Sequence, residues 1–493
     1  MWDSNNMFLN GPYAPWREEG EAFDLEIDGQ LPDELNGALF RVGANPMYRP
    51  KDPSRYHWFE GDGMVHALFL RDGRASYRNR YVETVGLQRE RQEGRSLYGG
   101  FMNPSEFPLP PGTFPKNLAN THVSLFDNRL LVFCEADVPH ELRPDTLETV
   151  SQRYDFHGGF SGPPLTAHHK IDPANGDILT FGNRGGTVTW FRADRHGRVL
   201  DLHTVDLGVP TFTHDYAVTT DYAIFLVNPA MVRFEHYLKG VPSTVWEPET
   251  LDTCRWAVLH RRTGEVTWVE APDAFTETHF LNAYQDGSKI VVDGHRTPRF
   301  GPTWKELESP PPGGDWNWWF KNIVATPWRW ELDLATGKAT DSQVNDILGE
   351  FPRINDQRTG QRHRYGYYAT TRGTGDWFID GLAKHDYLTG ETSMQTADGV
   401  LTSPSEPEFV PRPGATAEDD GWLLSTWWDP TTDRSEVIVQ EAQDFTAAPI
   451  ARIKLNHRVP LTTHGSWSDA SDLYAALWGS CAPGILWAAG RRR

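Results

Sequence analysis

Four histidines lie in a similar local sequence, each preceded within two residues by threonine. They are His168 in TAH (166–168), His214 in FTH (212–214), His279 in ETH (277–279) and His464 in TTH (462–464). Neutral imidazole is a ligand for iron, copper, zinc or nickel. Because imidazole carries no charge, a set of four imidazoles without thiolate or carboxylate ligands leaves the metal ion its full positive charge. An iron ion held in this way keeps positions for O2. Because the four are far apart in the sequence, the alternative of unrelated turn histidines stays open.

Each of these histidines is expected to open a β-hairpin. After His214 the sequence predicts a strand over 215–219, a turn at 220–221 and a second strand over 222–226. In a β-propeller the first strand of each blade lines the central channel, so histidines at such positions would meet at one point. His169 should face the other way, since strand side chains alternate, and it is given no ligand role.

The rest of the chain predicts a nearly all-β protein, because short strand patterns separated by turn signals dominate it. Four turns share one chemistry, with glycine supplying the positive φ: DPANGD (172–177), HRRTGE (260–265), DLATGK (333–338) and DYLTGE (386–391). Their spacing is too irregular for a solenoid but fits propeller blades with insertions. No Gly/Ser or charged linker divides the sequence, so we expect a single domain over residues 1–493.

Composition excludes some functions. The formal net charge of −20 over 493 residues argues against nucleic-acid binding. The three cysteines, Cys134, Cys254 and Cys481, are too few for a disulfide framework, which fits a reducing compartment. No export signal and no run of 18 apolar residues is visible, so a cytoplasmic location is expected.

The sequence resembles the carotenoid cleavage oxygenase family over nearly its whole length. The matching motifs are LNGALFRVGANP (35–46), FEGDGMVH (59–66), AHHKIDP (167–173), HD (214–215), HFLNAY (279–284), EFPRIN (350–355), EPEFVPRP (406–413), EDDG (418–421) and VPLTTHG (459–465). The resemblance implies a seven-bladed β-propeller whose loops form a dome over an axial Fe(2+). It also implies that His168, His214, His279 and His464 hold the iron. His169 departs from the family, which usually has proline there.

Three glutamates are implied as partners of these histidines. A metal-bound imidazole needs its second nitrogen fixed, usually by a carboxylate. By motif, the family's three glutamates fall on Glu135, Glu350 and Glu406. Each is flanked by apolar residues or proline, where an unpaired carboxylate would be costly.

The resemblance implies a non-haem iron(II) dioxygenase that cleaves a carbon–carbon double bond with O2 to give two carbonyl products. No catalytic residue beyond the iron centre is then required. The substrate classes are stilbenoids, phenylpropenoids and apocarotenoids. Two alternatives stay open: an iron-dependent isomerase or isomerohydrolase that consumes no O2, and a non-catalytic metal-binding propeller. The oligomeric state is left open.

The resemblance also bears on the substrate pocket. In the lignostilbene enzymes a tyrosine and a lysine hold the substrate phenol, and a phenylalanine stacks on its ring. Phe59 matches the phenylalanine, but Phe101 and Cys134 stand at the tyrosine and lysine positions. A site without these donors cannot strongly favour a phenolate by that route. Either another group holds the phenol, or the substrate is a more apolar polyene.

An aromatic segment over residues 316–330 has two interpretations. It is either an interfacial patch that makes peripheral membrane contact to collect a lipophilic substrate, or part of the dome and core. We favour dome and core, because large exposed apolar patches are uncommon and the segment has no basic face.

Overall fold

Strands dominate the computed structural model, as the sequence predicts. The structure describes Trp2, residues 4–100, Asn103 and residues 116–309, 317–321, 323–373, 379–396 and 400–478. Its α-helices are short: α1 (Val85–Glu93), α2 (Phe234–Lys239), α3 (Trp304–Glu308), α4 (Trp318–Lys321) and α5 (Ala470–Trp478). The all-β assignment is therefore confirmed.

Most strands belong to sheets of four or five strands. One contains β1 (Gly20–Ala22), β5 (Arg74–Tyr81), β4 (Gly63–Arg71), β3 (Gly37–Ala44) and β32 (Gly465–Asp469) in that order. The next contains β6 (His122–Phe126), β7 (Arg129–Phe133), β8 (His140–Leu142) and β9 (Thr149–Ser151). A third contains β10 (Lys170–Ile171), β11 (Ile178–Arg184), β12 (Thr187–Ala193) and β13 (Val199–Asp206). Neighbouring strands in these sheets are antiparallel.

The central part of the chain forms a larger sheet. Its eight strands are β14 (Ala217–Val218), β15 (Tyr222–Val227), β18 (Arg255–His260), β19 (Val266–Glu270), β23 (Lys338–Gln343), β22 (Thr326–Asp333), β21 (Lys289–Thr297) and β20 (Thr276–Asp286). A separate ribbon pairs β16 (Ala230–Val232) with β17 (Thr244–Trp246). In the large sheet, β19 and β23 are joined by one parallel pair, Glu270 with Lys338.

The C-terminal half of the chain supplies two more sheets. One contains β24 (Gly349–Arg353), β25 (Tyr365–Thr371), β26 (Ile379–Asp386) and β27 (Thr392–Thr396). The other contains β2 (Ile27–Gly29), β31 (Ala451–Lys454), β30 (Arg434–Glu441), β29 (Gly421–Asp429) and β28 (Glu408–Pro411). Two sheets thus combine strands from opposite ends of the chain, since β2 pairs with β31 and β3 pairs with β32.

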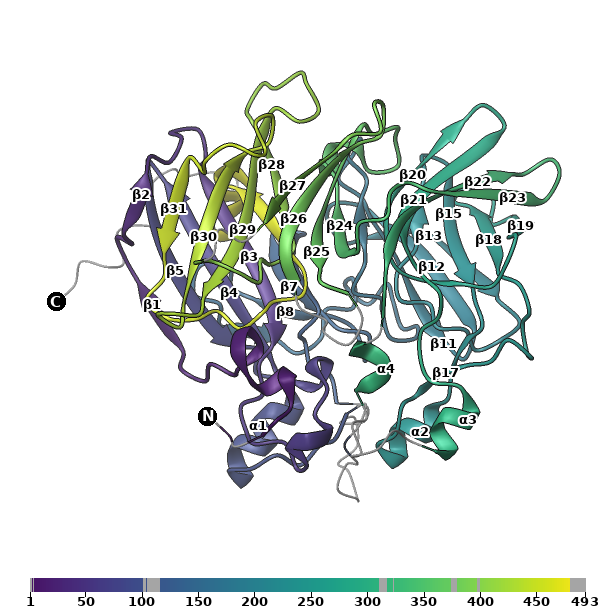
Figure 1. Cartoon of the computed structure of the whole chain (residues 1–493), viewed down its shortest axis with the longest axis horizontal. Helices are drawn as coiled ribbons and strands as arrows, with labels where there is room; N and C mark the ends of the chain where they lie inside the picture. The colour runs from purple at the N-terminus through teal and green to yellow at the C-terminus, as the bar shows by residue number, and fades with distance from the viewer. Residues whose placement is uncertain are drawn as a thin grey trace.

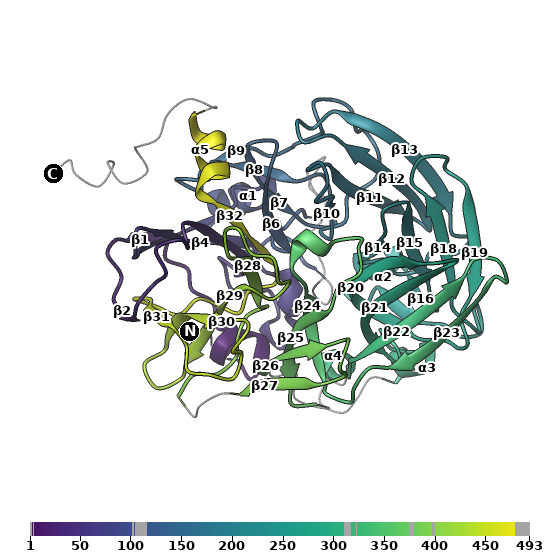
Figure 2. The same cartoon turned by 90° about the horizontal axis from the view of Figure 1, so that it is seen from above.

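Seen from above, the sheets follow one another around a common centre, which is a propeller-like arrangement (Figure 2). Burial follows position in a sheet. The middle strand β15 is an apolar run that is almost completely buried, whereas the edge strand β13 alternates between exposed and half-buried residues. The four shared turns contain Gly176, Gly264, Gly337 and Gly390, which have φ values of 77°, 77°, 67° and 78°. These glycines confirm the predicted turn chemistry.

Helices α1, α2, α3 and α4 gather on one side of the strands (Figure 1). There an aromatic core includes Trp58, Trp319 and Phe320. Trp319 and Phe320 are buried in this core, and Trp330 is buried in another hydrophobic cluster. For these three residues of the aromatic segment 316–330, burial supports the dome-and-core interpretation over an interfacial patch. Trp316 lies outside the described residues. Among the described residues, no helix combines the length and apolar character needed to cross a bilayer.

Candidate metal centre

The structure brings the four predicted histidines together from three sheets. Three of them, His168, His214 and His464, stand just before β10, β14 and β32. His279 differs from the expectation, because it lies inside β20 where the register with β21 shifts between Glu277 and Phe280. Such a bulge re-aims a side chain, which explains how a residue within a strand joins the cluster. One ligand atom from each histidine lies within 4.8 Å of the other three.

The donor set fits a bound transition metal. The Nε2 atoms of His168 and His214 are 2.9 Å apart, close to the spacing of ~3.0 Å for two nitrogens about 2.1 Å from one ion at right angles. Nε2 of His279 is buried and has no hydrogen-bond partner among the described residues. A buried polar atom without a partner is costly, and a metal ion would satisfy it.

Burial keeps two of the imidazoles neutral, which is the form that binds metal. Burial and the neighbouring histidines hold the pKa of His168 well below its ordinary value. Burial also lowers the pKa of His464 to about 4, although Glu406 opposes this shift. At His214 burial is the largest influence and favours the neutral form as well, but the charge and hydrogen bond of Glu135, together with the charges of Asp215 and Glu350, raise the pKa.

Three of the histidines have a carboxylate on Nδ1. His214 lies 2.7 Å from Glu135 Oε1, His279 lies 2.5 Å from Glu350 Oε2, and His464 lies 2.8 Å from Glu406 Oε1. These are the three glutamates that the motifs single out. With Nδ1–H donated to a carboxylate, each Nε2 is left unprotonated and its ring is fixed in direction.

Glu406 sits in a buried network of charges. Arg41 Nη1 donates to its Oε2 at 2.8 Å, and Arg353 Nη1 lies 3.6 Å from the same oxygen. Burial opposes ionisation of Glu406, but His464 and the two arginines hold its pKa far below the ordinary value. The sequence analysis missed both arginines, since their partners are distant in the chain.

Glu350 and Glu135 are in different surroundings. Glu350 is buried, Phe351 N donates to its Oε2 at 2.9 Å, and its Oε1 has no partner in the described structure. Burial is the largest influence on its pKa and would raise it, but the charge and hydrogen bond of His279, together with His295 and the Phe351 N–H, lower the pKa. The Glu135 side chain is 37% exposed. The three carboxylates therefore hold their histidines with different strengths.

Aromatic rings flank the cluster on several sides. Phe351 lies 5.5 Å from His279 and 5.4 Å from His464 between ring centroids. Phe212 is parallel to His214 at 5.8 Å and stacks on Phe300 at 4.7 Å. The sequence analysis missed these residues, although Phe212 is two residues from His214 and Phe351 directly follows Glu350.

The three predicted pocket residues have different outcomes. Phe59 packs edge-on against Phe320 at 5.4 Å, and its carbonyl accepts from Asn120 Nδ2 at 3.0 Å. Cys134 is a half-buried free cysteine next to Glu135, and burial raises the pKa of its thiol. Phe101 lies outside the described residues.

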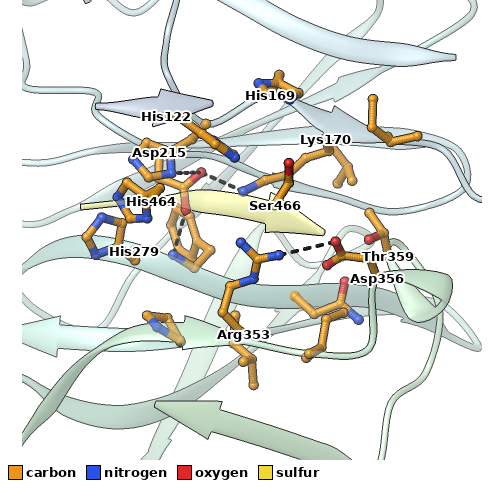
Figure 3. A pocket seen from close by; sticks show the side chains of 18 of the residues that line it. His122, His169, Lys170, Asp215, His279, Arg353, Asp356, Thr359, His464 and Ser466 are labelled. Atoms are coloured by element: carbon orange, nitrogen blue, oxygen red, sulfur yellow. Dashed lines mark hydrogen bonds and ion pairs between the residues drawn. The ribbon is translucent and has the colours of Figure 1, made fainter. Parts of the chain in front are cut away.

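A cavity of about 360 Å³ reaches the cluster. His168, His279 and His464 line its inner end, together with the charged residues Lys170, Asp215 and Arg353. Figure 3 shows Lys170 beside Asp215, and Arg353 beside Asp356. His169 also lines this cavity, where its Nε2 is 2.8 Å from Ser124 Oγ. We call this space the axial cavity.

A propeller-like all-β fold that gathers four imidazoles at one point defines a metal-binding propeller protein. The family model described as retinal pigment epithelial membrane protein matches residues 13–469. The chain therefore belongs to that family, the carotenoid cleavage oxygenases, and the resemblance noted in the sequence is confirmed.

Individual relatives agree with this assignment. The chain is 31% identical to isoeugenol monooxygenase of Pseudomonas nitroreducens, covering 94% of this chain and 98% of the relative. It is also 31% identical to apocarotenoid-15,15'-oxygenase of Synechocystis, covering 93% and 95%. The crystal structure of Pseudomonas brassicacearum lignostilbene dioxygenase matches with a TM-score of 0.85 at 29% identity, covering 95% of this chain and 100% of that one. The chain is accordingly an enzyme of the oxygenase type.

Proposed function

We propose that this protein is a non-haem iron(II) dioxygenase that cleaves a carbon–carbon double bond of a stilbenoid, phenylpropenoid or apocarotenoid, giving two carbonyl products. The observation that carries the proposal is the convergence of His168, His214, His279 and His464. Among the described residues, the group of side chains close enough together to hold a metal ion consists of these four histidines, with no cysteine or carboxylate among them. An octahedral ion would keep two positions for O2 and substrate, and neutral nitrogen donors suit iron.

The protein's own groups have separate tasks in this reaction. Bound ferrous iron would supply the activation of O2 that an alkene alone cannot achieve. Glu135, Glu350 and Glu406 hold Nδ1–H of three histidines, so that Nε2 of each ring faces the metal position. Phe212 and Phe351 flank the cluster and give it apolar walls. No acid or base from the protein is needed.

The pocket favours a flat, largely apolar alkene. Phe212 supplies aromatic surface beside the cluster, and Phe59 packs against the same apolar core as Phe212. Cys134 offers only a weak donor where the resemblance would place a lysine. A phenol would therefore lack the charged partner that holds it in the lignostilbene enzymes. We propose that double-bond position and ring stacking, rather than a phenolate clamp, select the substrate.

We also propose that the propeller has seven blades within one domain. The eight-stranded sheet joins β19 to β23 through a single residue pair. Divided there, it gives two four-stranded blades, β14-β15-β18-β19 and β20-β21-β22-β23. These two and the five other sheets of four or five strands make seven.

Isotope labelling tests the reaction. The protein is loaded anaerobically with ferrous iron and incubated briefly in 18O2 with resveratrol, isoeugenol or an apocarotenal. We expect one labelled oxygen atom in each of the two carbonyl products, detected by mass spectrometry. His214→Ala should abolish turnover, whereas His66→Gln, at a buried histidine bonded to Tyr77 instead of the cluster, should retain it. Turnover without O2 consumption, or label in only one product, would contradict a dioxygenase.

A further inference from the structure

In the part of the chain that the structure describes, no glutamate lies on Nδ1 of the fourth histidine, His168. Its Nε2 faces the cluster, 2.9 Å from Nε2 of His214. A ring that binds metal through Nε2 carries its proton on Nδ1 and needs an acceptor there. The carboxylate that faces this atom belongs to Asp215, whose Oδ1 is 4.0 Å from His168 Nδ1.

Asp215 is a buried carboxylate held by three hydrogen bonds. Its Oδ1 accepts from Lys170 Nζ at 2.8 Å and from its neighbour Tyr216 N at 2.7 Å, and its Oδ2 accepts from Phe280 N at 2.9 Å. The Asp215 side chain is only 1% exposed. Phe280 belongs to β20, so the carboxylate ties the segment of His214 to the strand of His279.

The axial cavity places His168 and Asp215 in one space. Both line its inner end together with Lys170. A separation of 4.0 Å between the two atoms is too long for a direct hydrogen bond and is short enough for one water to contact both. At that distance in a buried site, the carboxylate charge also favours a proton on Nδ1 over one on Nε2.

From these contacts we infer that Asp215 is the positioning residue of His168. From its place in the axial cavity, Asp215 orients the His168 ring through Nδ1, as the glutamates orient the other three histidines. It fixes the tautomer in which Nε2 is free for the metal. The inference rests on the proposed metal site but concerns a residue that neither the motifs nor the glutamate pattern assigns.

Metal affinity in a double-mutant cycle tests the inference. Cobalt(II) binding is followed by visible absorption in the wild type, Asp215→Asn, His168→Ala and the double variant. We expect Asp215→Asn to weaken binding about 10-fold or more, and to have no further effect when His168 is already alanine. Glu350→Gln, which acts on His279, should still weaken binding in the His168→Ala background.

Two controls separate positioning from folding. Asp293→Asn removes another fully buried carboxylate, paired with Arg329 at 2.8 Å, and should change the unfolding midpoint without changing the cobalt spectrum. Replacing His168 by Nδ1-methylhistidine keeps Nε2 but removes the Nδ1–H donor, and leaves the backbone bonds of Asp215 intact. Because the methyl group itself locks the tautomer in which Nε2 is free, Asp215→Asn should no longer weaken cobalt binding in this background, although it still removes the same buried charge.

The outcomes are distinct. Absence of cobalt binding by the wild type would overturn the proposed metal site itself. Normal wild-type binding with equal losses from Asp215→Asn in the wild-type and His168→Ala backgrounds, or an undiminished loss from Asp215→Asn in the Nδ1-methylhistidine background, would overturn the role of Asp215 and leave the metal site standing.

Discussion

At the scale of single residues, the three glutamates do the same task in three environments. Glu406 is buried with Arg41 and Arg353 beside it, Glu350 is buried without such a cation, and Glu135 is partly exposed. A charge-assisted hydrogen bond is stronger where water cannot compete for either partner. Removing the carboxylate charge should therefore cost most at Glu406 and least at Glu135.

Metal affinity should follow this order. Glu406→Gln is expected to weaken ferrous iron binding by roughly 10 to 100-fold. Glu135→Gln should weaken it less, because solvent already screens the charge that is removed there. Competition with a chelator, monitored by metal analysis, measures both values. Glu408→Gln is the matched control, since Glu408 is also buried and contacts Arg353 at 3.0 Å but touches none of the four histidines. Equal losses at Glu406 and Glu135 would contradict the environmental argument.

A gain of function is expected at the substrate pocket. The variant Cys134→Lys combined with Phe101→Tyr introduces the two donors that hold the phenol in the lignostilbene enzymes. A buried cation paired with a phenolate discriminates strongly against an analogue that lacks the hydroxyl. We expect kcat/KM for resveratrol to rise relative to its trimethyl ether by at least 10-fold. Cys134→Met with Phe101 unchanged is the control for size, and an equal rise there would refute the role of charge.

The sequence could predict some of these residues but not others. Histidines and glutamates carry distinctive local motifs, so their types and neighbours suggest a role before any contact is known. Asp215, Arg41 and Arg353 act through partners that lie close only after folding; Arg41 and Glu406, for example, are 365 residues apart. No periodicity or motif spacing encodes such a pair. The aromatic residue Phe351 was equally hidden, because its φ of 58° departs from the strand pattern around it.

At the scale of elements, hairpins and their glycine turns were predictable from local chemistry, whereas the bulge in β20 was not. An extra residue in a strand leaves no distinct sequence signature of its own. Close approach of two backbones is a second feature of the strands that the sequence does not predict. Gly465 begins β32 directly after His464, and a Cβ there would lie 2.0 Å from the carbonyl oxygen of Phe40 in β3.

Gly465→Ala should therefore disturb both the ring closure and the metal site. The β3 and β32 backbones would have to separate, which moves His464 away from the other ligands. We expect loss of about 3 kcal/mol or more of unfolding free energy, typical of strain in a packed core, with a parallel drop in cobalt affinity. Urea unfolding and cobalt titration measure the two effects. Gly20→Ala in β1 is the control, because the nearest atom to its Cβ would be 3.9 Å away; a similar loss there would contradict the steric explanation.

At the scale of the whole molecule, composition and turn chemistry predicted the all-β, propeller-like architecture, but not how the sheets divide. A single residue pair between β19 and β23 joins the four strands β14-β15-β18-β19 to the four strands β20-β21-β22-β23, so that they form one sheet. Ring closure was also invisible in the sequence, since β2 and β3 pair with strands more than 400 residues later. Such pairings depend on global topology rather than local propensity.

Acid stability is a property that many parts of the molecule share. Burial lowers the pKa of several histidines to about 3 or 4: His57, His66, His140, His169, His295 and His457. In the unfolded chain each returns to an ordinary value of about 6.5. Between these values the unfolded state binds more protons than the folded state, so stability falls as the pH drops below about 6.5.

The size of this effect can be stated for one residue. A fully buried histidine such as His66 contributes about 2 kcal/mol of destabilisation on going from pH 7 to pH 5, since each pH unit below 6.5 costs about 1.4 kcal/mol. We expect the urea midpoint of the metal-free protein to fall steeply over this range and to depend much less on pH between 7 and 8. Working without metal excludes proton-driven metal release as the cause. His66→Gln should reduce the slope, because one proton-uptake site is removed from the unfolded state. A midpoint that stays constant from pH 7 to pH 5 would mean that these histidines are protonated in the folded protein, and that burial does not keep them neutral.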